Sequence, residues 1–501
     1  MAGRDPSDGL IVAVDQGTSA TKAIVVDHQG TIRRRASVPI AQHHPQPGWA
    51  EQNPWEIWRS VQRVVAESLA GLDPARVLGV GLSTQRESTL LWNRRTGEPL
   101  GPVLGWQDNR GATMCGRLRE AGHAERIRSV TGLPLDAMFS ASKATALLDT
   151  HDPDRTRSRH GDLCLGTVDS WLLYQLGGQH LIETGNAART LLLDIGRRQW
   201  DPWLTELFNV PVQTLPTVVP STERMTFCHH LPPIPTSVPV TGVLGDSHAA
   251  LFAHAGWQPG QVKVTYGTGS SVMGITTTDQ APSTGVARTI AWELDDDPSY
   301  ALEGNIRSSG ATLVWLAKLF GTTPAQIAAA AGSHAGGVVL VPAFTGLGAP
   351  WWDDQARALI TGLSEGTRLE HLARAALESI AFQVEDVVAA MEQAGGPITA
   401  ILADGGPSSN ATLMQLQADT SNRQVSTSQL AELSALGAAH AAGVGLGLWT
   451  LADLEQLPRV RTSYRPSLDR NRAADRRHAW HSAVQAARTI QHSVALTDEH
   501  D

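Results

Sequence analysis

The chain has 501 residues, of which 42% are hydrophobic and 18% are charged. That length and composition allow a core of more than one domain and exclude the disordered, collagen-like and coiled-coil classes. The 40 Lys and Arg residues and the 49 Asp and Glu residues give a formal net charge of −9, which argues against a dedicated nucleic-acid-binding protein.

Signals for export or membrane insertion are weak. The apolar run at 10–14 is too short for the core of a signal peptide. The other candidate, 435–449, is rich in glycine, contains His440 and falls short of the ~18–20 apolar residues of a spanning helix. Three widely spaced cysteines imply no disulfide framework. We therefore expect a cytoplasmic protein that does not contact a membrane.

The first part of the chain alternates strand and helix signals. Short β-rich runs separated by turn residues predict strands over 10–14, 23–27 and 31–40. Apolar residues at helical spacing predict a helix over 55–69, and the run 77–85 predicts a strand that ends in polar residues. This alternation indicates the α/β class.

The same pattern starts again near residue 240. A strand is predicted to end at Asp246, where a helix begins, and 261–275 repeats the opening order of strand, Gly-Thr turn and strand. The Pro-rich stretch 231–239 predicts a loop before this repeat. We therefore expect two domains, 1–243 and 244–501.

Two later segments are predicted as helices. The stripe of apolar residues over 368–393 is typical of a long amphipathic helix. The Arg-rich segment 459–488 has helical spacing and also contains acidic residues, so we interpret it as a solvated surface helix rather than a nucleic-acid-binding element.

Two glycine turns have the composition of phosphate-binding loops. In DQGTSATK, Gly17 permits close backbone approach, the hydroxyls of Thr18 and Ser19 are available, and Lys22 adds a positive charge. Asp15, at the strand end, is a candidate Mg²⁺ ligand. Alone, this turn is more typical of an ordinary glycine hairpin than of a phosphate-binding loop. A second Gly-Thr turn at 266–269 favours a site in which two loops hold one nucleotide, while the absence of GxxxxGK[ST] argues against a P-loop enzyme.

Polar residues at three other strand ends are candidates for the chemistry. Asp246 is either a helix N-cap or a general base that takes the proton of a substrate hydroxyl. Arg86 and Glu87 either bind vicinal hydroxyls, one donating and one accepting, or form a surface ion pair. The turn DGGPSSN at 404–410 either holds a flat ring against its glycines or is a turn with an Asn cap.

Taken together, these motifs resemble the FGGY family of carbohydrate kinases, most closely its members that phosphorylate glycerol. The resemblance covers nearly the whole chain in order, through DQGTSATK, STQRES, WQDNR, GDSHAALF, TYGTGS, ALEGNIRSSGATLVWL, VPAFTGLGAPWWD and DGGPSSN. It implies a two-domain actin/Hsp70/ribonuclease-H-like ATPase fold with ATP and Mg²⁺ in a nucleotide cleft between the domains. It also implies a small-molecule polyol or sugar as substrate, and homo-oligomers are possible.

The resemblance assigns roles to individual residues. Asp246 is the base, and Asp15 and Asp246 face Mg²⁺. The nucleotide-binding positions are Gly17, Thr18, Ser19, Lys22, Gly267, Thr268, Gly310, Gly405, Gly406 and Asn410. The substrate positions include Arg86, Glu87, Trp106 and Asp246. Lys22 stands where these kinases usually have Arg, which keeps the charge and loses the bidentate fork.

Three substrate positions depart from the family pattern. Met138, Ser247 and Ser271 stand where a tyrosine, a glutamine and a phenylalanine are usual. Their smaller or more flexible side chains imply a looser fit around three carbons. The leading hypothesis is an ATP-dependent kinase for a terminal hydroxyl of glycerol or a closely related small polyol. The alternatives are a kinase for a larger polyol or a ketose and, more distantly, an actin- or chaperone-like nucleotide switch.

Overall fold

Two large mixed sheets organise the computed structural model, which describes residues 9–279, 282, 285–468 and 470–489. The first sheet has the order β13-β14-β5-β1-β2-β3, and the second has the order β17-β18-β16-β15-β21-β22-β23. The strands of the first sheet are β1 (Leu10–Gln16), β2 (Ala20–Asp27), β3 (Ile32–Pro39), β5 (Val77–Thr84), β13 (Thr226–Phe227) and β14 (Pro239–Gly245). Those of the second sheet are β15 (Gln261–Tyr266), β16 (Ser270–Thr276), β17 (Ala287–Leu294), β18 (Asp297–Ile306), β21 (Ala400–Asp404), β22 (Gln424–Ser428) and β23 (Arg461–Tyr464).

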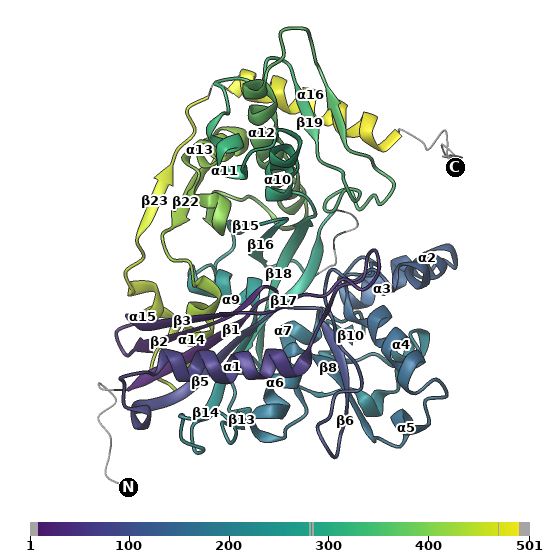
Figure 1. Ribbon diagram of the computed structural model, residues 1–501, viewed down its shortest axis with the longest axis vertical. Coiled ribbons are helices and arrows are strands. Elements are labelled where there is room, and N and C mark those ends of the chain that lie inside the picture. Colours follow the sequence, from purple (N-terminus) through teal and green to yellow (C-terminus); the bar gives the residue numbers. More distant parts are fainter. Residues whose placement is uncertain (1–8, 280–281, 283–284, 469, 490–501) are drawn as a thin grey trace.

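Helices and smaller strands complete the two halves seen in Figure 1. The helices are α1 (Pro54–Ser68), α2 (Ala112–Glu120), α3 (Ala124–Thr131), α4 (Ser140–His151), α5 (Thr156–Arg159), α6 (Val168–Gly177), α7 (Thr184–Ala187), α8 (Pro202–Leu207), α9 (Asp246–Ala253), α10 (Gly310–Leu319), α11 (Pro324–Ala329), α12 (Leu369–Gly395), α13 (Ala411–Ser421), α14 (Leu433–Gly445), α15 (Leu451–Gln456) and α16 (Arg470–Thr489). A four-stranded sheet contains β4 (Glu51–Gln52), β7 (Val103–Leu104), β6 (Thr89–Asn93) and β8 (Leu163–Thr167). Two-stranded sheets pair β9 (Leu181–Glu183) with β12 (Thr217–Val219), β10 (Leu193–Asp194) with β11 (Gln199–Trp200), and β19 (Val339–Val341) with β20 (Leu359–Thr361).

The two large sheets are built on one plan. In the first, β1 forms an antiparallel hairpin with β2 and pairs in parallel with β5, which pairs in parallel with β14. In the second, β15 forms a hairpin with β16 and pairs in parallel with β21, which pairs in parallel with β22. The predicted repeat of the glycine hairpin and the α/β class are therefore confirmed. The hairpin turn occupies the equivalent position in the two sheets: it follows β1 in the first sheet and β15 in the second.

Helices α9 and α14 join the two halves. α14 packs on β14, β5 and β1 of the first sheet and against α9, while α9 contacts β14 and β5 as well as β15 and β16 of the second sheet (Figure 1). α14 contains most of the apolar segment 435–449, which is buried here against the first sheet. In the described part of the chain, no helix combines the length and the hydropathy needed to cross a membrane.

His440 lies in α14 and makes the stability of the protein depend on pH. Its side chain is 2% exposed, and within the described part of the chain neither ring nitrogen has a hydrogen-bond partner. Burial lowers the pKa of His440 to about 3, so the folded protein holds a neutral ring that the unfolded chain protonates below pH ~6.5. This contribution to stability is present above that pH and is lost as the pH falls toward 3.

We expect His440→Leu to flatten that pH dependence. The free energy of unfolding of the native protein should fall by up to about 4 kcal/mol more than that of the variant between pH 7 and pH 3. Urea unfolding at a series of pH values measures the difference. His230→Leu, at an exposed position, is the control and should retain the native slope. Parallel curves for the native protein and His440→Leu would contradict the prediction.

The Arg-rich segment 459–488 is not a single solvated helix. Its first part forms β23, the edge strand of the second sheet, and α16 begins only at Arg470. One face of α16 is buried because Trp480 stacks on Phe382 of α12 and donates a 2.7 Å hydrogen bond to Asp386. The prediction of a solvated helix was wrong for these parts, since the helical spacing did not reveal the carboxylates and aromatic ring of α12 on the other side.

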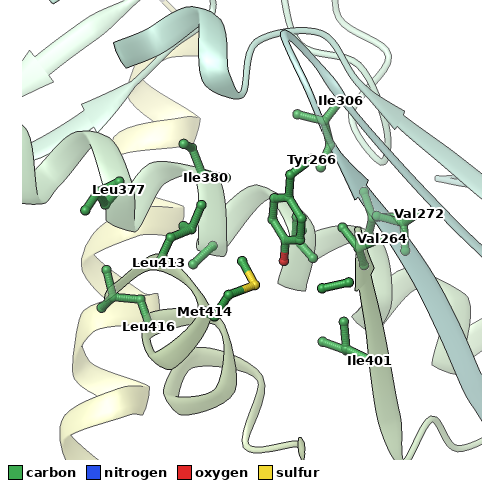
Figure 2. Close-up of a cluster of buried hydrophobic side chains, with 14 of the residues drawn as sticks. Val264, Tyr266, Val272, Ile306, Leu377, Ile380, Ile401, Leu413, Met414 and Leu416 are labelled. Atoms are coloured by element: carbon green, nitrogen blue, oxygen red, sulfur yellow. The ribbon is translucent and has the colours of Figure 1, made fainter. Parts of the chain in front are cut away.

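The core of the second half fixes the start of its hairpin turn. Figure 2 shows apolar side chains of β15, β16, β21, α12 and α13 around Tyr266, the last residue of β15. The Tyr266 hydroxyl donates a 3.0 Å hydrogen bond to Oε1 of Gln417 in α13. A fully buried ring with a satisfied hydroxyl holds the backbone of the following turn in one place. The turn after Tyr266 is therefore anchored from inside the core.

Candidate active site

The turn between β1 and β2 holds the first group of predicted residues. Asp15 lies near the end of β1, opposite Ser83 of β5, and Oγ of Ser83 donates a 2.8 Å hydrogen bond to Oδ1 of Asp15. Burial raises the pKa of Asp15 to about 6, and the neighbouring charge of Asp246 acts in the same direction. The structure thus brings the two predicted carboxylates close enough to interact, one near the end of β1 and the other at the start of α9, directly after β14.

In the rest of this turn, a predicted nucleotide-binding residue contacts a predicted substrate-binding residue. Trp106 is 36% exposed, and its Nε1 donates a 3.0 Å hydrogen bond to Oγ1 of Thr18. Gly17 N donates to Ala20 O at 3.0 Å and closes the turn, while Ser19 is exposed. Lys22 follows in β2, and its positive charge lowers the pKa of Asp15 against the effect of burial. The structure therefore shows a closed turn between β1 and β2 whose Thr18 contacts Trp106.

The second turn is tied to the start of α10. Gly310 N donates to Gly267 O at 2.9 Å, and Ala311 N donates to Thr268 O at 3.0 Å. A Cβ at Gly310 would lie 2.6 Å from Gly267 O, so a larger residue would push α10 away from the turn. The structure therefore brings Gly267, Thr268 and Gly310 together.

The glycine turn after β21 approaches the same hairpin. Gly405 has a φ of +88°, and a Cβ there would lie 2.0 Å from Tyr266 O. Gly406 is exposed with open space around its Cα. Asn410 is the N-cap of α13, and its Oδ1 accepts a 3.0 Å hydrogen bond from Leu413 N. The capping interpretation of Asn410 is thus confirmed, and its amide nitrogen is the part left for a ligand.

Asp246 begins α9 directly after β14. The N-cap of the helix is Gly245, which makes no side-chain capping bond, and Oδ1 of Asp246 accepts a 2.6 Å hydrogen bond from Ser247 N. The Asp246 side chain is 39% exposed. Burial raises the pKa of Asp246, while the charge of Arg86 opposes the rise and the charge of Glu87 adds to it. The carboxylate is therefore an accessible proton acceptor rather than the N-cap of α9.

Arg86 and Glu87 belong to a buried ionic network, which excludes the surface ion pair considered from the sequence. Arg86 donates through both terminal nitrogens to Glu303, at 2.9 and 2.6 Å. Arg189 contacts Glu87 at 2.6 Å and Glu303 at 2.8 Å. Glu87 has a φ of 61°. Although burial opposes it, the two guanidinium groups hold the pKa of Glu303 well below its usual range.

Three donors of this network have no hydrogen-bond acceptor within the described part of the chain: Nε of Arg86 and the two terminal nitrogens of Arg189. Nε of Arg86 is buried and makes no hydrogen bond within the described part of the chain. It lies 3.4 Å from Oδ1 of Asp246 and 3.9 Å from Oε1 of Glu87. An orphan donor between two carboxylates is the arrangement that a substrate hydroxyl completes, because a hydroxyl accepts one hydrogen bond and donates another.

The three departures from the family pattern lie together. Oγ of Ser247 is 3.4 Å from Oγ of Ser271, which is in turn 3.4 Å from Oε1 of Glu303. The Met138 sulfur lies 4.0 Å from Nδ2 of Asn305. Small hydroxyls and a flexible thioether therefore surround the part of the network that faces the second sheet.

The carboxylates of this site fit a magnesium ion. Mg²⁺ is usually held by one or two carboxylates together with water and substrate phosphates. Asp15 and Asp246 are two such groups. The charge of Asp246 adds to the raised pKa of Asp15. A cation beside them relieves that repulsion. Within the described part of the chain, no cluster of three or more His, Cys, Asp or Glu residues has the arrangement of a protein-only metal site.

Sequence reasoning missed several residues of the site. Glu303 and Arg189 complete the network around Arg86. Lys263 is a buried residue of β15 in the second hairpin, and it donates a 2.9 Å hydrogen bond to Oγ1 of Thr265. A signal for Glu303 was present, because it follows the apolar residues Ala301 and Leu302, and a carboxylate among buried apolar residues needs a buried partner. The sequence carried no comparable signal for Arg189, since its role depends on contacts across the chain.

Comparison with known proteins agrees with this geometry. The model of the N-terminal domain of the FGGY family of carbohydrate kinases matches residues 10–253, and the model of its C-terminal domain matches residues 262–446. A glycerol kinase of Aromatoleum aromaticum is 44% identical over 95% of this chain and 98% of its own length. An apulose kinase of Pectobacterium atrosepticum is 42% identical over 96% of this chain and 98% of its own length.

Solved structures show the same architecture. Glycerol kinase of Plasmodium falciparum with ADP superposes with a TM-score of 0.89 at 29% identity, covering 96% of this chain and 99% of that one. A xylulose kinase of Lactobacillus acidophilus superposes with a TM-score of 0.85 at 22% identity, covering 95% of this chain and 97% of that one. The predicted two-domain sugar-kinase fold is confirmed by these matches.

Proposed function

Because the chain belongs to the FGGY family of carbohydrate kinases, whose members are phosphotransferases with an alcohol acceptor, we propose that it transfers the γ-phosphoryl group of ATP to a terminal hydroxyl of glycerol or a closely related small polyol. The observation that carries this proposal is the orphan Nε of Arg86, held between the carboxylates of Asp246 and Glu87. A vicinal diol satisfies this donor and both acceptors. The alternative of a nucleotide switch without an acceptor gives this arrangement no role.

The acceptor is bound by the buried network and activated by Asp246. Glu303 and Arg189 fix Arg86 and Glu87, so the two side chains lose little further entropy when a diol binds. Trp106 provides an exposed aromatic wall beside them. Oδ2 of Asp246 accepts the proton of the terminal hydroxyl while the hydroxyl oxygen attacks the γ-phosphorus. The bond between the γ-phosphorus and the β,γ-bridging oxygen breaks, and ADP leaves with that oxygen. The raised pKa of Asp246 makes it a stronger base than an ordinary carboxylate.

The nucleotide is held between the two glycine turns. Backbone N–H groups and hydroxyls of Gly17, Thr18 and Ser19 face the phosphates from one side, and Lys22 contributes charge. The other nucleotide contacts come from Gly267, Thr268, Gly310, Gly405, Gly406 and Asn410. Asp15 and Asp246 would hold Mg²⁺, which supplies charge neutralisation at the phosphate oxygens.

Closure of the two domains, 1–243 and 244–501, would exclude water from the reacting groups. An open site that holds ATP beside a base would hydrolyse ATP without forming product. We place the reaction in the cytoplasm, where ATP is available.

A larger polyol or a ketose is the second candidate acceptor. Ser247, Ser271 and Met138 replace two aromatic side chains and an amide of the family pattern and lie together at the site. The relative named apulose kinase is about as similar to this chain as the glycerol kinases are.

Acceptor-dependent release of ADP tests the proposal. The enzyme is assayed with Mg-ATP and glycerol, dihydroxyacetone, erythritol, threitol, xylitol, ribitol, xylulose and ribulose in parallel. We expect ADP release to rise well above the rate without acceptor for at least one of these compounds. A rate that no acceptor changes would contradict the proposal. The same panel decides between glycerol and a larger acceptor.

A further inference from the structure

A row of polar side chains runs from β18 toward elements of the first half of the chain. Glu303 and Asn305 alternate along β18, Arg307 follows directly after its end, and alternate residues of a strand share one face. Glu303 reaches Arg86, Asn305 reaches Met138, and Arg307 reaches Oδ2 of Asp136 at 3.3 Å. The row therefore begins at the ionic network that binds the acceptor in the proposed function and continues away from it.

Asn305 is the member of this row whose side chain has the weakest polar contact. It is half-buried, and within the described part of the chain the 4.0 Å contact with the Met138 sulfur is the one polar contact of its side-chain amide. A thioether sulfur is a weak acceptor, so both ends of the amide remain available to a ligand. Its neighbour across the sheet is Ser271, whose hydroxyl lies 3.4 Å from Glu303.

The two guanidinium groups that contact Glu303 of this row already have carboxylate partners. Arg86 and Arg189 are matched by Glu303 and Glu87. A carboxylate or phosphate on the acceptor would therefore enter next to acidic groups without gaining an unpaired guanidinium. Asn305, in contrast, donates and accepts hydrogen bonds without carrying charge.

Arg307 at the far end is equally committed. It pairs with Asp136 at 3.3 Å and with Asp354 at 2.6 Å, and it donates to Thr345 O at 2.7 Å. The guanidinium of Arg307 therefore already has three polar partners. The row thus ends at Arg307, directly after β18, and this guanidinium is paired with Asp136.

We infer that Asn305 is a specificity-determining residue, which binds a hydroxyl or carbonyl oxygen beyond the third carbon of an uncharged four- or five-carbon polyol or ketose. The inference rests on the proposed function, because it needs the terminal diol to be held by Arg86 and Glu87. Glycerol fills only the inner part of the site. A longer acceptor also reaches the Asn305 amide, across the space that Met138 and Ser271 leave.

The test compares acceptors within one enzyme. The ratio of kcat/KM for the best four- or five-carbon acceptor to kcat/KM for glycerol is measured in the native enzyme, Asn305→Ala and Ser299→Ala. Ser299 lies on the same strand, six residues before Asn305 and ~20 Å away along it, which makes it a matched control. We expect Asn305→Ala to lower the ratio about tenfold, since it removes one hydrogen bond to the longer acceptor, and Ser299→Ala to keep it.

A second variant guards against a folding defect at Asn305. Met138→Tyr adds a rigid ring next to Asn305 and should lower the same ratio at least tenfold. Gluconate, as a charged acceptor of six carbons, should give no ADP release above background in the native enzyme.

Four outcomes separate failure of the inference from failure of the proposed function. A native enzyme that uses glycerol better than every longer acceptor would overturn the inference and leave the proposed function standing. An equal loss for all acceptors in Asn305→Ala, or robust turnover of gluconate, would also overturn it. An enzyme that responds to no acceptor at all would contradict the proposed function itself.

Discussion

Replacement of Asp246 by asparagine is expected to lower kcat by about two to four orders of magnitude, the range that general-base catalysis contributes. Asparagine keeps the size of the side chain and can still accept the hydrogen bond from Ser247 N, but it cannot take a proton from the acceptor. Binding of ATP should survive, because the two glycine turns do not depend on the Asp246 carboxylate for their shape.

Steady-state ADP release and calorimetric titration with ATP measure the two effects separately. Asp201→Asn is the matched control, since Asp201 caps α8 and asparagine caps a helix as well as aspartate. That control should keep native activity. If Asp246→Asn retained more than a tenth of native kcat, Asp246 would not be the base.

Replacement of Glu303 by glutamine is expected to lower the free energy of unfolding by about 3–5 kcal/mol, the usual cost of removing one member of a buried charge network. Glu303 is fully buried and faces both Arg86 and Arg189. With a neutral amide in its place, the two guanidinium groups share the carboxylate of Glu87, and Arg86 keeps the partly exposed carboxylate of Asp246. The kcat/KM for the acceptor should fall as well, because Arg86 loses its fixed position.

Urea unfolding without ligands measures the stability change. Glu67→Gln is the control, because it breaks an exposed ion pair with Arg63 on α1 and exposed pairs contribute less than about 1 kcal/mol. A loss in Glu303→Gln no larger than the loss in this control would show that the network does not hold the site together.

Local patterns were sufficient to predict the two hairpins and the residues in their turns. Small residues between β-rich runs indicate the turns at 15–22 and 266–269. Hydrogen bonding between neighbours in sequence then fixes the shape of these turns. Asp246 was found for the same reason, since the end of a strand and the start of a helix are both visible in the chain.

Contacts between distant segments could not be read in the same way. The partners of Arg86 include Glu303, more than two hundred residues further along the chain, and nothing local marks that pairing. The Arg-rich segment 459–488 shows the same limit. Its charges are consistent with a solvated helix until the buried carboxylates of α12, such as Asp386, are placed beside it.

The measurement that tests the central claim most directly is ³¹P NMR of a reaction with Mg-ATP and the best acceptor of the panel. Transfer to a terminal hydroxyl predicts one equivalent of a primary phosphomonoester for each equivalent of ADP, and neither species without acceptor. Formation of ADP with inorganic phosphate alone, or of a phosphomonoester on an internal hydroxyl, would contradict the role given to Arg86, Glu87 and Asp246.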